Sequence, residues 1–243
     1  MLYSIIFIII RIAPGDPAVA VLGDNASEAA VATVRERMGL NVPLATQYLE
    51  FFRGLLRGDL GVSLITGRPI ADQLAAVLPH TLQLTFTALF LGLAIGLPLG
   101  IVTAVRQNTP VDYVGRIVSL LGLSFPAFFI AVVLMLLFSI RLGLFPTVGA
   151  GDFTDPIENL RYLVLPATSL GLISTAYITR ITRSVVLNIL PEDYVRTARA
   201  KGMPEVLVLF RHSLRPALIP IVSLVGIFLI SLIGSSVIGP NWL

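Results

Sequence analysis

Four long apolar stretches restrict this chain to folds that cross a membrane. They cover roughly residues 80–105, 117–140, 160–179 and 216–238. An α-helix needs about 20 mostly apolar residues to cross the hydrocarbon core of a bilayer. The composition agrees, because 56% of the 243 residues are apolar and 13% are charged, whereas soluble domains average roughly 45–50% and about 25%. The sequence therefore predicts an all-α polytopic membrane protein with four complete spans.

The two ends of the chain are expected to differ from these spans. Residues 1–12 form an apolar run that would rise only about 18 Å as a helix, so they predict a partial first transmembrane helix. The run lacks a basic segment before it and a small-residue cleavage site after it, which argues against a signal peptide. Residues 239–243 form a short tail after the last span.

The polar region at residues 13–79 is predicted to fold as a small extracytoplasmic helical cap. Helix signals are present at residues 27–38, where Ser27 is a suitable N-cap and Gly39 a suitable stop. They are also present at residues 44–56, which carry an apolar stripe at helical spacing. A turn is expected at residues 58–61. These signals favour a structured cap over a linker.

Positive charge near the spans predicts the orientation of the chain. Arginines frame the loop at residues 106–116, and the loop at residues 180–215 carries seven basic residues against three acidic ones. The loop at residues 141–161 has two arginines against three acidic residues. Because Lys and Arg concentrate in cytoplasmic loops, we expect loops 106–116 and 180–215 in the cytoplasm and the cap outside. The transmembrane domain then covers residues 80–238.

The segment at residues 193–205 is predicted to form a compact knob on the cytoplasmic loop. Asp193 opens a helix of about two turns, and Gly202 is a natural left-handed stop before a second short helix that starts near Pro204. Small side chains would let a partner approach, and cationic side chains surround them. The predicted docking residues are Asp193, Tyr194, Arg196, Thr197, Ala198, Arg199, Ala200, Lys201, Gly202 and Glu205. Charge patterning by itself leaves open a basic loop that only sets the topology.

Two groups of motifs resemble one family of transport proteins. The runs DYVRTARAKG and RHSLRPALIP resemble the cytoplasmic "EAA" coupling loop of ABC-importer permeases, in the "B"-type subunit of the dipeptide and oligopeptide (and nickel) family. Thr197, Ala198 and Gly202 stand at the Ala, Ala and Gly positions of that pattern, and Arg196 replaces its Glu. The runs RIAPGDP at residues 11–17 and RGDLG at residues 57–61 are similar to the external amino-terminal region of the same family. The resemblance covers nearly the whole chain.

The resemblance implies an ABC importer type I permease-like bundle of six helices. Its partners would be a homologous second permease subunit, two cytoplasmic ABC ATPase subunits and an extracytoplasmic peptide-binding protein. The knob around Gly202 would insert into a groove on an ATPase, and ATP and magnesium would bind to the ATPases. The chain itself would bind no cofactor and catalyse no reaction, and it has no Gly-Lys-Ser/Thr phosphate loop. Against the family pattern, the chain is expected to be truncated at both ends.

Composition and motif content make other functions less suitable. The chain has no cysteine and two distant histidines, which disfavours a metal site. It also lacks a basic face interleaved with aromatic residues, which argues against nucleic-acid binding. Membrane lipid is the expected surrounding, in the cytoplasmic (inner) membrane of a bacterium or archaeon. An intramembrane enzyme would need a mid-span catalytic pair, and a passive channel would need charged rings or a filter loop. The remaining alternative is the same architecture importing nickel chelates, haem or glutathione.

The translocation pathway is the hardest feature to predict. Polar side chains inside spans are the usual candidates, and we select Ser124, Ser174, Thr175 and Tyr177. Hydrogen bonding between helices, or back to a carbonyl of the same helix, is an alternative role for each of them. No acidic residue, Lys or His lies in the middle of a span, which argues against a proton-coupled transporter. The main prediction is therefore ATP-coupled transport of di- or oligopeptides.

Overall fold

The computed structural model describes residues 4, 7–8, 16–23, 26–37, 39–63 and 66–238. The predicted partial helix at residues 1–12 and the tail at residues 239–243 lie almost entirely outside these ranges. The chain divides into two compact units between Val77 and Leu78, and each is described by itself. In the described residues the structure is built from helices, with an isolated antiparallel bridge between Val62 and Pro69.

The first unit contains three short helices, α2 (Pro17–Leu22), α3 (Glu28–Arg37) and α4 (Leu44–Leu56). Helices α3 and α4 confirm the predictions for residues 27–38 and 44–56, and the Ser27 hydroxyl caps α3 by accepting a bond from the Ala30 N–H at 3.3 Å. The apolar stripe of α4 places Tyr48 against the ring of Phe7, with centroids 5.4 Å apart. Local signals thus account for the helices of this unit.

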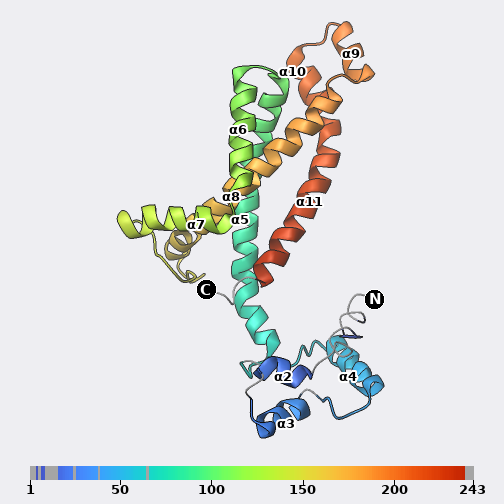
Figure 1. The fold of residues 1–243 in the computed structure, drawn as a ribbon. Helices are drawn as coiled ribbons and strands as arrows, with labels where there is room; N and C mark the ends of the chain where they lie inside the picture. The colour runs from blue at the N-terminus through green and yellow to red at the C-terminus, as the bar shows by residue number, and fades with distance from the viewer. Residues whose placement is uncertain are drawn as a thin grey trace. The chain divides into compact units, whose positions relative to one another are not determined.

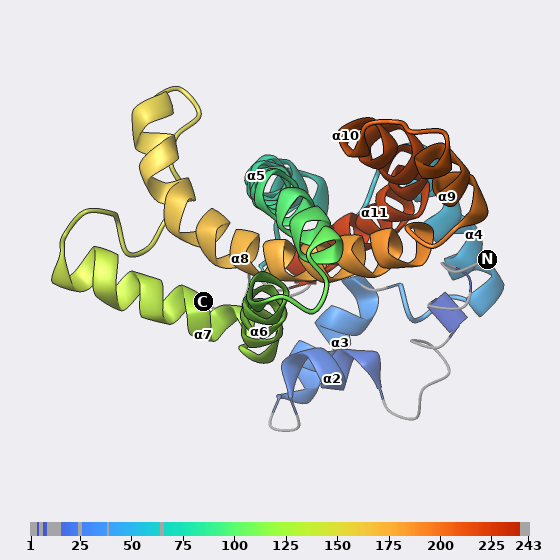
Figure 2. The same ribbon diagram turned by 90° about the horizontal axis from the view of Figure 1, so that it is seen from above.

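The second unit is organised around the long helix α8, as Figure 1 and Figure 2 show. Helix α8 contacts α5, α6, α7 and α11. The elements that reach into or form this unit are α5 (Ile70–Val105), α6 (Pro110–Ser124), α7 (Ala127–Leu134), η1 (Met135–Arg141), α8 (Pro156–Ile189), α9 (Asp193–Ala200), α10 (Glu205–Leu207), η2 (Val208–Leu214) and α11 (Arg215–Ile238). Elements η1 and η2 are π-helical.

Three helices in the described ranges are long and apolar enough to cross a membrane. They are α5, α8 and the continuous helix from Glu205 to Ser231. The sequence predicts one further span at residues 117–140, but the structure divides this stretch into α6 and α7–η1, bent by 95°. Pro126 explains the break, because proline has no N–H to donate and holds the preceding Phe125 in an extended conformation (φ −90°, ψ 132°). The bent pair can count as a fourth span.

Helices α5 and α8 approach closely because glycines recur every four residues on α5. A Cβ atom on Gly92 would lie 2.6 Å from the Ser174 Cβ, and one on Gly100 would lie 2.5 Å from the Thr182 Cβ. A Cβ atom on Gly96, which lies between them, would be 2.9 Å from the Thr175 carbonyl oxygen. Small residues at this spacing let transmembrane helices pack backbone to backbone. These glycines hold α8 at a fixed position beside α5.

Candidate functional site: the elbow at Gly202

The predicted cytoplasmic knob folds as an elbow, which we define as α9, the turn at residues 201–204 and α10. Asp193 lies in the first turn of α9, where a negative charge favours the helix amino terminus. The helix ends at Ala200, and Gly202 follows with φ +74°. Its N–H donates to the Arg199 carbonyl at 2.9 Å. The left-handed stop predicted at Gly202 is confirmed, because glycine adopts positive φ without a steric penalty.

The second arm of the elbow differs from the expected short helix. Helix α10 begins at Glu205, and η2 and α11 continue it without interruption to Ile238. The π-helical turn η2 lies directly before Pro216, which has no N–H for an α-helical bond. Because of this wider π-helical turn, the helix continues through Pro216 without a break. The elbow is therefore attached directly to a membrane-spanning helix.

The two arms pack on each other through a small apolar core. Val195 and Ala198 of α9 and Val208 of η2 are buried, and Ile189 and Met203 pack beside them. Ala198, predicted to face a partner, therefore belongs to the interior of the elbow. Because both arms share this core, the elbow can move as one rigid body.

An ion pair across the turn closes the elbow. The Arg199 Nη2 donates to the Glu205 Oε1 at 2.7 Å, and the Arg199 Nε lies 3.2 Å from Oε2. This hydrogen bond raises the pKa of the Arg199 guanidinium above its usual value. Both side chains are about half exposed, so the pair stabilises the elbow by less than about 1 kcal/mol. Its main contribution is to hold the two arms at a defined angle.

Reversing one charge of this pair is expected to open the elbow. Arg199→Glu places two carboxylates together, and we expect trypsin to cleave after Lys201 several-fold faster in inverted membrane vesicles. The double variant Arg199→Glu/Glu205→Arg restores an opposite-charge pair and should return the cleavage rate to that of the wild type. Equal rates in the wild type and the single variant would show that the pair does not hold the elbow closed.

The outer surface of the elbow carries the other predicted docking residues. Tyr194, Arg196, Thr197, Ala200 and Lys201 are exposed. The side chain of Arg196 is 72% exposed, and its ion pair with Asp193 is long, at 3.5 Å. These side chains are available to a partner, whereas Arg199 and Glu205 are engaged with each other.

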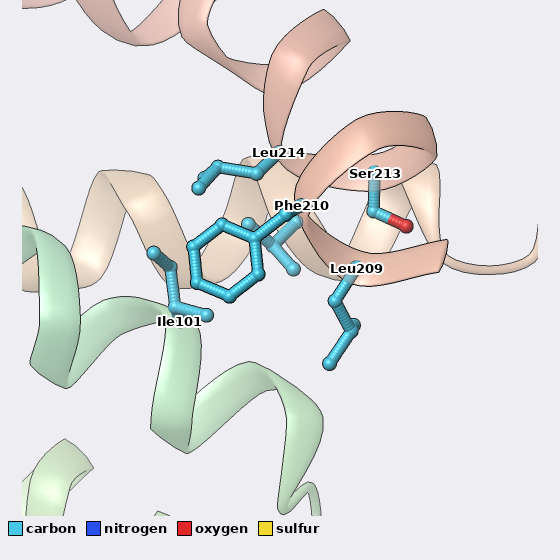
Figure 3. A pocket seen from close by; sticks show the side chains of 6 residues that line it. Ile101, Leu209, Phe210, Ser213 and Leu214 are labelled. Carbon is cyan, nitrogen blue, oxygen red and sulfur yellow. The ribbon is translucent and has the colours of Figure 1, made fainter. Parts of the chain in front are cut away.

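An apolar pocket lies between η2, which follows the elbow, and the helices α5 and α8. Ile101 of α5, Val186 of α8 and four residues of η2 line this pocket. Figure 3 shows the ring of Phe210 projecting from η2 toward Ile101, with Leu214 beside it. Element η2 also contacts α8 directly.

A buried charge cluster lies close to the same end of α8, and the sequence analysis missed it. The Asp112 carboxylate of α6 is fully buried and accepts two bonds from Arg183 of α8, from Nε at 2.7 Å and Nη2 at 3.0 Å. It also accepts from the Asn108 N–H at 2.9 Å and lies 3.1 Å from the Arg116 Nη2. The available signal was an acidic residue in an otherwise basic cytoplasmic loop, four residues before an arginine.

The four predicted pathway residues lie on two helices that pack against each other. Ser124 lies at the end of α6, whereas Ser174, Thr175 and Tyr177 lie on α8. The hydroxyls of Ser124 and Ser174 each donate to the carbonyl four residues earlier, at 2.7 Å and 2.9 Å. Tyr177 stacks on Phe228 of α11 with centroids 4.6 Å apart. The pathway role of these residues stays a prediction.

Long apolar helices joined to a rigid, charged elbow define a polytopic transport subunit. Residues 96–240 match the family described as "Binding-protein-dependent transport system inner membrane component", and residues 1–85 match its amino-terminal membrane component. The chain belongs to this family. It is thus a multi-pass inner-membrane permease component of an ABC import system, and membership implies ATPase and binding-protein components as partners.

Named relatives align with almost all of the chain. The glutathione transport system permease protein GsiC of Salmonella typhi is 37% identical over 234 residues, which are 96% of this chain and 74% of the relative. The dipeptide transport system permease protein DppB of Alkalihalophilus pseudofirmus is 36% identical, with 96% and 76% covered. The oligopeptide transport system permease protein AppB of Bacillus subtilis is 38% identical, with 96% and 75% covered.

Proposed function

We propose that this chain is the permease subunit of an ATP-driven importer of short peptides and that its elbow docks on an ATPase. The observation that supports the proposal best is the elbow itself, a rigid body with an exposed cationic face that continues directly into α11. A movement imposed on this face is transmitted to a membrane-spanning helix without an intervening flexible joint. The same movement reaches α8 through the contact between η2 and α8.

The complete machine would contain partners on both sides of the membrane. We assign to it a homologous second permease subunit, two cytoplasmic ATPases and an extracytoplasmic peptide-binding protein. ATP and magnesium would bind to the ATPases, and this chain would contribute the membrane passage and the mechanical contact. Lipid would cover the exposed apolar faces of α5, α8 and α11.

The cargo is proposed from the named relatives. The names of these relatives give a dipeptide, an oligopeptide and glutathione as the transported molecules. Glutathione is itself a tripeptide, so the three names share one chemistry, a short chain of amide-linked amino acids. We therefore propose di- and oligopeptides as the cargo class.

Docking at the elbow can be tested by reversing one exposed charge. Arg196→Glu is expected to reduce the amount of ATPase that copurifies with the chain by roughly tenfold, because a like charge at an interface costs several kcal/mol. Arg196 is suitable because it is exposed and contributes nothing to the apolar core of the elbow. The measurement is the ratio of ATPase to permease after affinity purification in detergent.

Arg211→Glu is the matched control for this experiment. Arg211 is an exposed arginine on η2, on the other side of Gly202. Its reversal makes the same change in net charge, and we expect it to leave the ratio within twofold of the wild type. An undiminished ratio in Arg196→Glu would contradict docking at α9. An equal loss in both variants would indicate attraction by net charge alone.

A further inference from the structure

A small cavity lies at the opposite end of α8 from the elbow. Its volume is about 110 Å³, which is enough for several water molecules. This space accommodates a small chemical group such as one amide. The lining residues come from α5, the loop before α8 and α8 itself, and they are His80, Gln83, Leu84, Gly149, Ala150, Gly151, Asn159, Tyr162, Leu163 and Pro166.

Two glycines allow the loop to form one wall of the cavity. A Cβ atom on Gly151 would overlap the backbone of Asn159, and one on Gly149 would lie 3.0 Å from the ring of Tyr162. Gly149 also has φ +120°, a conformation that side-chain-bearing residues rarely adopt. The Asn159 Nδ2 donates to the Gly151 carbonyl at 3.2 Å. The wall is therefore held against the first turns of α8 by close contact and a hydrogen bond.

A hydrogen-bonded pair of side-chain amides belongs to the lining of the cavity, and several other polar atoms of the lining residues have no hydrogen-bond partner in the part of the chain that the structure describes. The Gln83 Nε2 donates to the Asn159 Oδ1, which joins α5 to α8. His80 is held by stacking on Phe153, with centroids 4.5 Å apart. Among the described residues, the Gln83 Oε1, the Tyr162 hydroxyl and the His80 ring nitrogens have no hydrogen-bond partner. The residues that carry these atoms line the cavity, and the atoms include both donors and acceptors.

The chemistry of the lining selects a class of ligand. No Lys, Arg, Asp or Glu is among the lining residues, and the carboxylate of Asp152, which interacts electrostatically with His80, already accepts the Thr154 N–H at 2.9 Å. Uncharged donors and acceptors at close quarters match a group that both donates and accepts hydrogen bonds. An amide of a peptide main chain is such a group and has a size that fits the cavity.

The position of the cavity agrees with a role in peptide entry. Helix α8 has 34 residues and is about 50 Å long, whereas the hydrocarbon core is about 30 Å thick. Asn159 lies in the first turns of α8, and the elbow follows its last turn. An elbow in the cytoplasm therefore places the cavity at the external face, where the cargo arrives. Resting on the peptide cargo proposed above, we infer that this cavity binds one main-chain amide of the incoming peptide.

The test uses the complete transporter in proteoliposomes with radiolabelled trialanine as the probe. A photoreactive p-benzoylphenylalanine in place of Leu163, which lines the cavity, is expected to cross-link to trialanine. Excess unlabelled trialanine should remove the cross-link, and trialanine with N-methylated amides should compete at least about fivefold less well, because it has lost its donors. Uptake of trialanine is measured in the same preparation.

Two variants test the assigned polar atoms. Tyr162→Phe removes a hydroxyl and keeps the ring beside Gly149, and we expect about a threefold to fivefold lower cross-link yield at subsaturating trialanine. Gln83→Met/Asn159→Leu removes both partners of the amide pair and should lower the yield further. Tyr113→Phe, at an exposed side chain of α6, is the matched control and should not change it.

The outcomes distinguish a failure of the cavity assignment from a failure of the proposed cargo. Uptake of trialanine without cross-linking at residue 163, or with a yield that neither cavity variant lowers, would overturn the cavity assignment and leave the proposed importer intact. Absence of ATP-dependent trialanine uptake by the wild type would overturn the proposed cargo and the cavity assignment with it.

Discussion

Replacing Asp112 with asparagine is expected to lower the free energy of unfolding by roughly 3 kcal/mol. The change leaves the Arg183 guanidinium without its charged partner in a site where the carboxylate was fully buried. Breaking one side of a buried ion pair usually costs about 3–5 kcal/mol. We expect the lower end of that range because the side chain of Arg183 is 19% exposed and keeps some contact with water. SDS-induced unfolding of the purified protein in detergent micelles gives the measurement.

Two comparison variants give this prediction its specificity. Asp193→Asn makes the same chemical change at a side chain that is 96% exposed, and we expect a loss of no more than about 1 kcal/mol. Asp112→Asn/Arg183→Gln removes both charges and should recover part of the stability lost in Asp112→Asn. If Asp112→Asn and Asp193→Asn unfold at the same SDS fraction, the cluster does not stabilise the fold.

The cluster also has a mechanical consequence. Asp112 and Arg183 are 71 residues apart in the chain, and their contact ties the start of α6 to the last turns of α8. The elbow begins four residues after α8 ends. A tilt of the elbow therefore acts on α6 and α8 together, because the buried ion pair resists their separation.

Gly100→Val is expected to cost roughly 3 kcal/mol of stability, the upper end of the about 1–3 kcal/mol typical of overpacked cores. Its Cβ would lie 2.5 Å from the Thr182 Cβ and 2.8 Å from the Thr179 carbonyl oxygen. A carbonyl oxygen of the facing backbone cannot move aside as a flexible side chain can, so α5 and α8 must separate. The same SDS titration measures the loss.

Gly226→Val provides the matched control. Gly226 lies inside α11, and a Cβ atom there would meet nothing within 4 Å in the described part of the chain. The same substitution in a helix of similar apolar character is therefore expected to change the stability of the isolated chain by less than about 1 kcal/mol, the scale of helix propensity. A Gly100→Val loss no larger than that of Gly226→Val would show that α5 and α8 are not held at the separation described above.

Local sequence signals were sufficient for several elements. The apolar stripe of α4, the Ser27 cap of α3 and the left-handed glycine at residue 202 each depend on neighbours a few residues away. The run around Gly202 also indicated the family, through its resemblance to the coupling loop of ABC-importer permeases. These predictions needed no knowledge of distant contacts.

Other features depended on contacts that local patterns do not encode. Ala198 was predicted to face a partner, but Val208, ten residues later, covers it. The second arm of the elbow was predicted to be short, but a π-helical turn carries it past Pro216 into α11. The cavity at the start of α8 requires Gln83 and Asn159, which are 76 residues apart. Each of these outcomes follows from how helices pack.

Length, apolarity and charge along the chain determined that this protein crosses a membrane and where most of its helices lie, because hydrophobic burial and glycine conformation act locally, and the resemblance of its motifs indicated the family. Only the tertiary structure decided which side chains of the elbow are free, that the helix breaks before Pro126, that Asp112 joins Arg183 and that a cavity exists at the far end of α8. The physical reason is that these properties arise from the relative placement of helices, which depends on many weak contacts acting together.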